Sequence, residues 1–255
     1  MNCYNNTPPT TKTIIMKLQL INNKILKEAF ESISHIVDEI TMTCDNDGLY
    51  LRALSRDHIT FIIMDLNKTL FDIFDCQTPE KIAIDSTEFH KILRKCKPSD
   101  TLEIETDEHN LTLIFKGDAD RTFRIRQLDL EYENPEPPII QFPCTIELAP
   151  SLLKDIIDDM EVFADRLNFS VDEDYFITTT DADLGDAEVK YIHGENIKEY
   201  CKSSFSIPKL KDILRASKFS DKCRIHLGND APIKIEFIDN GGVLGYLLAP
   251  RLETE

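Results

Sequence analysis

Four carboxylates within one predicted helix are the side chains best placed to do chemistry. They are Asp155, Asp158, Asp159 and Glu161, within residues 151–163. Carboxylate oxygens are common ligands of Mg²⁺, so this cluster could hold the ion for phosphoryl chemistry. The same residues also fit the solvated face of an amphipathic helix, which is the interpretation that we favour. A Mg²⁺-dependent nucleic-acid phosphohydrolase therefore remains the alternative function.

The sequence contains none of the common motifs of catalysis or cofactor binding. The patterns G-x-x-x-x-G-K-[ST], G-x-G-x-x-G, H-E-x-x-H and G-x-S-x-G do not occur. Its six histidines lack the spacing of metal ligands. Residues 45–48 (DNDG) begin like a calcium-binding loop but lack its continuation and the glutamate at the twelfth position. We therefore expect no enzymatic activity, no bound metal and no cofactor.

Lysine and arginine gather on two predicted helices of an acidic chain. The 255 residues include 46 acidic and 29 basic side chains, a net charge of −17, yet residues 86–97 and 208–218 are mostly basic in their charged positions. Such segregation predicts a path for a polyanion such as duplex DNA, whose phosphates are contacted without reading sequence. Residues 23–34 are balanced in charge and residues 151–163 are acidic, so the attraction should be weak and uneven. The predicted DNA-facing residues are Lys24, Lys27, Lys91, Arg94, Lys95, Lys154, Lys209, Lys211, Arg215 and Lys218.

The elements that must position these side chains repeat along the chain. Residues 26–33 match 153–160 at an offset of 127, and residues 89–94 match 210–215 at an offset of 121. Apolar residues in these segments recur at i, i+3 and i+4, which predicts one-sided helices, with Ser86 and Ser151 as N-caps. Short β-rich runs lie between the helices. The pattern of strand, helix and several antiparallel strands, repeated four times, predicts an α+β chain of two similar lobes.

The proline- and glutamate-rich residues 131–138 are the best linker between the lobes. We divide the chain into an N-terminal extension (1–15), an N-terminal lobe (16–127), a connector (128–138) and a C-terminal lobe (139–255).

The cysteines are odd in number and include no C-x-x-C pair, which disfavours a disulfide framework and favours a reducing cytosol. No apolar run approaches the ~20 residues that span a bilayer, so we expect no membrane partner.

Three segments carry short motifs: residues 51–59 (LRALSRDHI), 91–96 (KILRKC) and 247–251 (LLAPR). They resemble the patterns L-Q-x-M-D-x-S-H-V, S-K-I-L-K-C and Y-L-A-P-K of the proliferating cell nuclear antigen family, the sliding clamps of archaeal and eukaryotic DNA replication. The resemblance runs from Met16 to the C-terminus, so residues 1–15 form an extension. It implies a two-lobed clamp fold in a closed homotrimeric ring, with four helices lining the hole and antiparallel sheets outside.

The resemblance also implies a function and its partners. The family encircles duplex DNA as a processivity factor without catalytic activity. It is opened by a clamp loader and tethers DNA polymerase, flap endonuclease and DNA ligase through short peptides. We accordingly expect a cytoplasmic, nucleoid-associated protein of replication and repair.

Two further sites follow from the resemblance. The family binds peptides of the form Gln-x-x-aliphatic-x-x-aromatic-aromatic in an apolar pocket, whose matching positions are Leu54, His58, Ile59, Leu128, Leu130, Pro232, Leu247, Ala249, Pro250 and Leu252. Its subunits pair edge strands, which fall here at about 119–126 and 186–193. The interface positions are Arg121, Phe123, Arg124, Arg126, Asp186, Glu188 and Lys190. Because one strand is basic and the other is mainly acidic, the trimer should be partly ionic.

Overall fold

The computed structural model describes residues 14–130, 135–183 and 185–251. Most of the predicted extension, connector residues 131–134 and the pocket residue Leu252 lie outside this part. The first half contains β1 (Met16–Leu20), α1 (Lys24–Ile36), β2 (Glu39–Cys44), β3 (Gly48–Leu54), β4 (Thr60–Asn67), the 3-10 helix η1 (Lys68–Leu70), β5 (Ile73–Cys76), β6 (Glu80–Asp85), α2 (Ser86–Leu93), β7 (Thr101–Thr106), β8 (Asn110–Lys116) and β9 (Arg121–Arg126). The second half contains β10 (Cys144–Leu148), α3 (Pro150–Glu161), β11 (Arg166–Val171), β12 (Tyr175–Ala182), β13 (Gly185–Ile192), β14 (Cys201–Ser206), α4 (Ile207–Leu214), the 3-10 helix η2 (Arg215–Lys218), β15 (Cys223–Leu227), β16 (Ile233–Asp239) and β17 (Gly242–Leu248).

The predicted order of one strand, one helix and several strands occurs four times, with β5 as an added strand. The strands form three antiparallel sheets, in the orders β5-β1-β7-β8-β9, β10-β15-β16-β17-β4-β3-β2-β6 and β13-β12-β11-β14. The middle sheet belongs to both halves, because β17 pairs with β4 from Gly242 opposite Leu66 to Leu248 opposite Thr60. The α+β fold class with four helices is confirmed.

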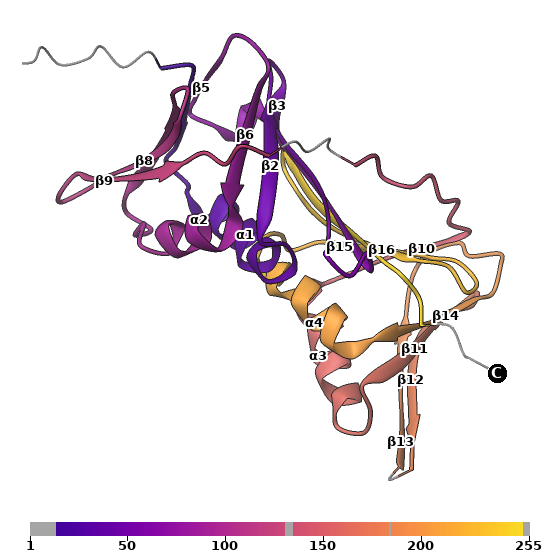
Figure 1. Ribbon diagram of the computed structural model, residues 1–255. Helices are drawn as coiled ribbons and strands as arrows, with labels where there is room; N and C mark the ends of the chain where they lie inside the picture. The colour runs from indigo at the N-terminus through magenta and orange to yellow at the C-terminus, as the bar shows by residue number, and fades with distance from the viewer. Residues whose placement is uncertain (1–13, 131–134, 184, 252–255) are drawn as a thin grey trace, which may run out of the picture.

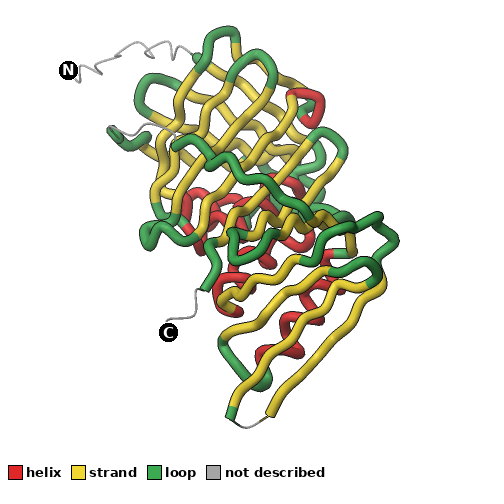
Figure 2. The backbone as a smooth tube through the Cα atoms, turned by 90° about the vertical axis from the view of Figure 1, so that its right-hand side faces the viewer, coloured by secondary structure: helices red, strands yellow, loops and turns green. Residues whose placement is uncertain are grey.

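All four helices lie on one side of the molecule (Figure 1), and the sheets cover their other side (Figure 2). The apolar stripe of each helix explains this layering. In α1, Leu26, Phe30 and Ile33 are completely buried. Phe30 packs edge-to-face on Phe89 of α2, with ring centroids 4.6 Å apart. The polar side of each helix is left facing away from the sheets.

The helix ends differ from the prediction in detail. Ser86 and Ser151 are not N-caps, because each already lies within its helix. Asp85 caps α2 instead, with its Oδ1 accepting a hydrogen bond from the Glu88 amide at 2.8 Å. Ala149 precedes α3 without a side-chain cap. The predicted ranges 86–97 and 208–218 are regular only to residues 93 and 214, and tighter turns follow.

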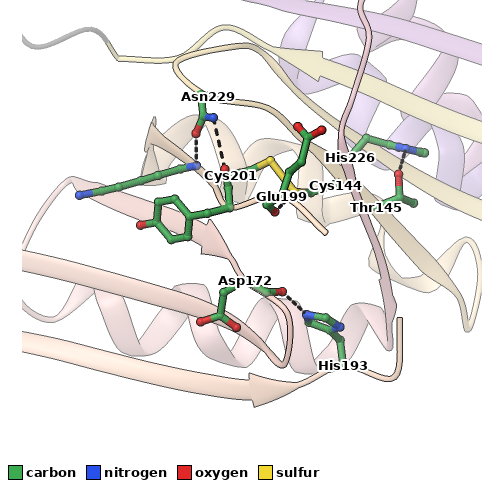
Figure 3. The surroundings of a disulfide bond; sticks show 10 residues. Cys144, Thr145, Asp172, His193, Glu199, Cys201, His226 and Asn229 are labelled. Atoms are coloured by element: carbon green, nitrogen blue, oxygen red, sulfur yellow. Dashed lines mark hydrogen bonds between the residues drawn. A yellow bond between two sulfur atoms is a disulfide. The ribbon is translucent and has the colours of Figure 1, made fainter. Parts of the chain in front are cut away.

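A disulfide joins Cys144 and Cys201, although the number and spacing of the cysteines disfavoured a disulfide framework (Figure 3). Their Cα atoms are 6.6 Å apart although 57 residues separate them in the chain. Each begins an edge strand, β10 of the eight-stranded sheet and β14 of the four-stranded sheet. Sheet packing brings these two strand ends together, and sequence spacing does not reveal that. The other cysteines within the described ranges, Cys44, Cys76, Cys96 and Cys223, are buried thiols.

The packing of Phe30 predicts a large loss of stability on truncation. Replacing Phe30 by Ala should lower the free energy of unfolding by about 3–5 kcal/mol, because it removes a buried ring and leaves a cavity. Urea unfolding at a fixed protein concentration measures the change. Lys24→Ala, at an exposed position of the same helix, is the control and should stay within about 0.5 kcal/mol of the wild type. Equal effects of the two substitutions would contradict the packing described.

Candidate nucleic-acid interface and peptide pocket

An apolar pocket of about 280 Å³ opens where β3, β4, β16 and β17 approach the connector. Its lining residues are Leu54, His58, Ile59, Phe61, Pro135, Glu136, Pro138, Pro232, Leu247 and Ala249. Six of them were predicted from the sequence: Leu54, His58, Ile59, Pro232, Leu247 and Ala249. We call this hollow the peptide pocket.

The β4–β17 pairing builds this pocket from opposite ends of the chain. Phe61 and Leu247 face each other in the ladder, and the Ala249 amide donates to the Ile59 carbonyl at 2.9 Å. The sequence analysis did not predict Phe61. Side chains two residues apart in a strand lie on the same face, so Phe61 could have been predicted from Ile59. Pro135 and Pro138 of the connector contribute to the wall of the pocket, together with Glu136.

The remaining predicted pocket residues lie elsewhere. Leu130 lines a neighbouring hollow of about 340 Å³ that shares Leu54 and His58 with the peptide pocket. Leu128 lies further back along the chain, where its amide donates to the Ala83 carbonyl at 2.8 Å. Pro250 is half-buried beside Ala249 but does not line the hollow. The connector therefore meets the pocket through its later residues, rather than through both leucines.

The hairpin tip between β3 and β4, residues 55–59, carries His58 and Ile59 into the pocket. Its carboxylate, Asp57, forms an ion pair with Lys209 of α4. Burial alone raises the pKa of the Asp57 carboxyl, but hydrogen bonds from Lys209 and Ser55 outweigh it and lower the pKa to about 2. Asp57 is therefore ionised throughout the neutral range, and the ion pair is present there.

Six of the predicted DNA-facing residues already have partners within the chain. The lysines Lys154, Lys209 and Lys211 form ion pairs with Asp158, with Asp57, and with both Asp158 and Glu161, respectively. Arg215 lies 3.5 Å from Asp212 and Lys91 lies 3.5 Å from Glu88. The Lys27 Nζ donates to the Cys96 carbonyl at 2.8 Å. Lys24, Arg94, Lys95 and Lys218 are exposed and form no ion pair with any residue that the structure describes.

Two carboxylates of the acidic cluster of α3 form ion pairs with lysines. Asp158 lies 2.6 Å from Lys154 and 3.4 Å from Lys211, and Glu161 also pairs with Lys211. The hydrogen bond from Lys154 lowers the pKa of Asp158, as expected for a paired carboxylate. Within the described ranges, no three His, Cys, Asp or Glu side chains come together as ligands for a metal ion. The geometry does not support the phosphohydrolase alternative.

The strands β9 and β13 are the outermost strands of their sheets, and each has one side without a partner strand in the described chain. Arg124 and Arg126 of β9 are exposed, as are Asp186, Glu188 and Lys190 of β13. Lys190 lies 3.0 Å from Glu188. Phe123 is half-buried and packs on Phe115.

Arg121 differs from the other arginines of β9 because it is used inside the subunit. It pairs with the buried carboxylate of Asp100, and its guanidinium donates to the Lys95 carbonyl at 2.9 Å. It also lies over the Phe115 ring, 5.2 Å from the centroid. Its charge is therefore neutralised before any second subunit approaches.

Comparison with known proteins identifies the chain. The family models for the N-terminal and C-terminal domains of proliferating cell nuclear antigen match residues 15–135 and 136–251. A "DNA polymerase sliding clamp" of Methanobrevibacter smithii is 44% identical over 243 residues, 94% of this chain and 100% of the relative. The protein of that name from Methanothermobacter thermautotrophicus is 42% identical with the same coverage.

A solved structure shares the fold, and the sequence matches establish the family. The crystal structure of proliferating cellular nuclear antigen from Entamoeba histolytica has a TM-score of 0.88 at 20% identity, covering 94% of this chain and 100% of that one. None of the helices within the described ranges has the length and apolar character to cross a membrane. The two family models together span almost the whole sequence, from residue 15 to residue 251, and the chain belongs to the proliferating cell nuclear antigen family.

Proposed function

We propose that this protein is a DNA polymerase sliding clamp, a ring that encircles duplex DNA and raises the processivity of a polymerase. The observation that carries the proposal is the match over nearly the whole chain to relatives of that name, at 44% and 42% identity. The clamp acts as a tether without catalytic activity or cofactor, in the cytoplasm beside the chromosome. A primer-extension assay with a polymerase and a clamp loader tests it: the protein should lengthen the products of single binding events.

Ring closure would use the free edges of β9 and β13. An unpaired edge exposes backbone donors and acceptors, and head-to-tail pairing in a trimer leaves none of these edges open. The exposed arginines of β9, Arg124 and Arg126, would then approach the carboxylates of β13, Asp186 and Glu188. Opposite charge on the two edges favours this pairing over β9 with β9 or β13 with β13.

The inner surface of the ring would be the helical side of each subunit. Cations without a carboxylate partner, such as Lys24, Lys95 and Lys218, would contact phosphates. Neutralisation of Lys154 and Lys211 by carboxylates keeps this attraction weak. Weak contact suits a sliding protein, because the closed ring rather than binding affinity retains the DNA.

The peptide pocket would receive the partner proteins. Its apolar lining suits the aliphatic and aromatic anchors of a Gln-x-x-aliphatic-x-x-aromatic-aromatic peptide. The glutamine would lie towards Ala249 and Pro250, at the end of β17. Polymerase, flap endonuclease, ligase and the clamp loader are the partners that we assign to this pocket.

Charge reversal on β9 should weaken the trimer. Replacing both Arg124 and Arg126 by Glu places like charges opposite Asp186 and Glu188. At low salt, the variant trimer should therefore dissociate at protein concentrations at which the wild-type trimer stays intact. Sedimentation at low and ~1 M salt measures this, since high salt screens the pairs. The further changes Asp186→Arg and Glu188→Arg should restore the trimer. Lys81→Glu, on the edge strand β6, is the control, and a trimer indifferent to every reversal would contradict this interface.

Removing unpaired cations should reduce the salt dependence of DNA binding. The triple variant Lys24→Ala, Lys95→Ala and Lys218→Ala should lower the slope of log K against log salt by roughly 0.9 for each phosphate that the variant no longer neutralises. Binding to a linear duplex, onto whose ends a closed ring can thread, gives the slope across a salt series. Lys154→Ala should change it less, because Asp158 already neutralises that charge. An equal change in both proteins would rule out this choice of phosphate-binding residues.

Truncating the pocket wall should weaken peptide binding. Ile59→Ala removes an apolar side chain from the wall and should raise the Kd of a synthetic peptide about tenfold, equivalent to about 1.4 kcal/mol, and Leu247→Asp should abolish binding. Calorimetry gives the Kd, and the solution mass checks the ring. The matched control is Ile73→Ala, since Ile59 and Ile73 are 38% and 41% exposed. If Ile59→Ala and Leu247→Asp both bind like the wild type, the peptide binds elsewhere.

A further inference from the structure

The hairpin tip of residues 55–59 separates two hollows. On one side it lines the peptide pocket through His58 and Ile59. On the other it lines a polar hollow of about 230 Å³ between α1, α4 and the tip. That second hollow is lined by His35, Ile36, Asp38, Ser55, Arg56, Asp57, Thr60, Lys209 and Asp212. The tip is thus a thin wall between the peptide pocket and the helical side.

The shape of this wall depends on polar contacts rather than on apolar packing. The Ser55 amide donates to the Thr60 carbonyl at 2.8 Å, and the Ser55 Oγ accepts from the Thr60 amide at 2.9 Å. The Asp57 Oδ1 accepts from the Ile59 amide at 3.2 Å. His58 has a left-handed backbone with φ of 58°, which is unfavourable for a residue other than glycine and must be held by its surroundings.

Asp57 is in turn held from the other lobe. Its second carboxylate oxygen, Oδ2, accepts a hydrogen bond from Lys209 Nζ. Lys209 lies in the first turn of α4, 152 residues further along the chain. Its side chain is about one-third exposed, as is that of Asp57. One carboxylate therefore links the backbone of Ile59 to a helix of the C-terminal lobe.

We propose that Lys209 is a positioning residue for the peptide pocket, acting through Asp57 on the backbone of His58 and Ile59, and not a DNA contact. The inference rests on the proposed function of the pocket. It reassigns Lys209 from the predicted DNA-facing set, because its ammonium group is committed to Asp57. Peptide affinity in this clamp then depends on a cation of the helical layer that the peptide never touches.

Calorimetry with a synthetic peptide of the Gln-x-x-aliphatic-x-x-aromatic-aromatic form tests the assignment. Lys209→Met keeps the aliphatic stem and removes the charge, and Asp57→Asn keeps the shape and removes the acid. Each should weaken binding about two- to fivefold, which is the range for a partly exposed charged pair. The double variant should be no weaker than either single variant, since both changes break one link. Lys222→Met, an exposed lysine 3.8 Å from Glu147 on the outer sheet, is the matched control and should bind like the wild type.

Two further readouts separate positioning from general damage. Hydrogen exchange at the Ile59 amide should accelerate in Lys209→Met, while the midpoint of urea unfolding stays near that of the wild type. The salt slope for DNA binding should be unchanged in Lys209→Met. Exchanging the charges, with Asp57→Lys and Lys209→Asp together, should not recover the peptide affinity, because a lysine at position 57 cannot accept the hydrogen bond from the Ile59 amide.

The outcomes distinguish this inference from the proposed function. If the wild type binds no peptide, the pocket assignment fails and the inference with it. If the wild type binds but Lys209→Met binds equally well, the pocket stands and the inference is overturned. If Lys209→Met lowers the salt slope for DNA binding and leaves the peptide affinity unchanged, Lys209 belongs to the residues that contact DNA. Additive losses in the double variant would show that the two residues act separately.

Discussion

The antiparallel pairing of β4 with β17 is the interaction on which the rest of the molecule depends. It joins strands from opposite ends of the chain into one eight-stranded sheet. With the lobes fixed in this way, α1 and α4 lie together on one side, and Phe61 faces Leu247 on the other. The helical side and the peptide pocket are therefore two faces of the same junction. Without this ladder, the pocket and the relation between the lobes would be lost.

Many cations of the subunit lie beside carboxylates, in a chain whose net charge is −17. Carboxylates neutralise several cations of the helices, so that Lys211 lies between Asp158 and Glu161, for example. On β9, Arg121 is turned inward to Asp100, whereas Arg124 and Arg126 stay exposed. In the proposed ring, this pairing would leave few cations of the helices to attract DNA against the net charge of −17, while the charges of β9 and β13 would lie at the edges where subunits meet. Such a ring would retain DNA by its closure and contact it only loosely.

Connections across the fold also tie the surfaces to one another. The disulfide between Cys144 and Cys201 fastens the edges of two sheets, and the Asp57–Lys209 pair fastens a hairpin tip to a helix. Both join segments that lie far apart in the sequence. Such links reduce the number of ways in which a surface loop can move, and a preorganised wall loses less conformational entropy when a peptide binds.

Local patterns in the sequence determined the helices, their buried stripes, the fourfold repeat and the family, because apolar periodicity and short motifs depend only on neighbouring residues. The resemblance to the family also identified six residues of the pocket. The partners of the charged side chains could not be predicted in this way. Sequence reasoning treated Lys209, Lys211 and Arg121 as free cations, and only the tertiary structure placed a carboxylate beside each. The reason is physical: a charge interacts with whatever lies within a few ångströms of it, and packing between lobes, rather than order along the chain, decides what that is.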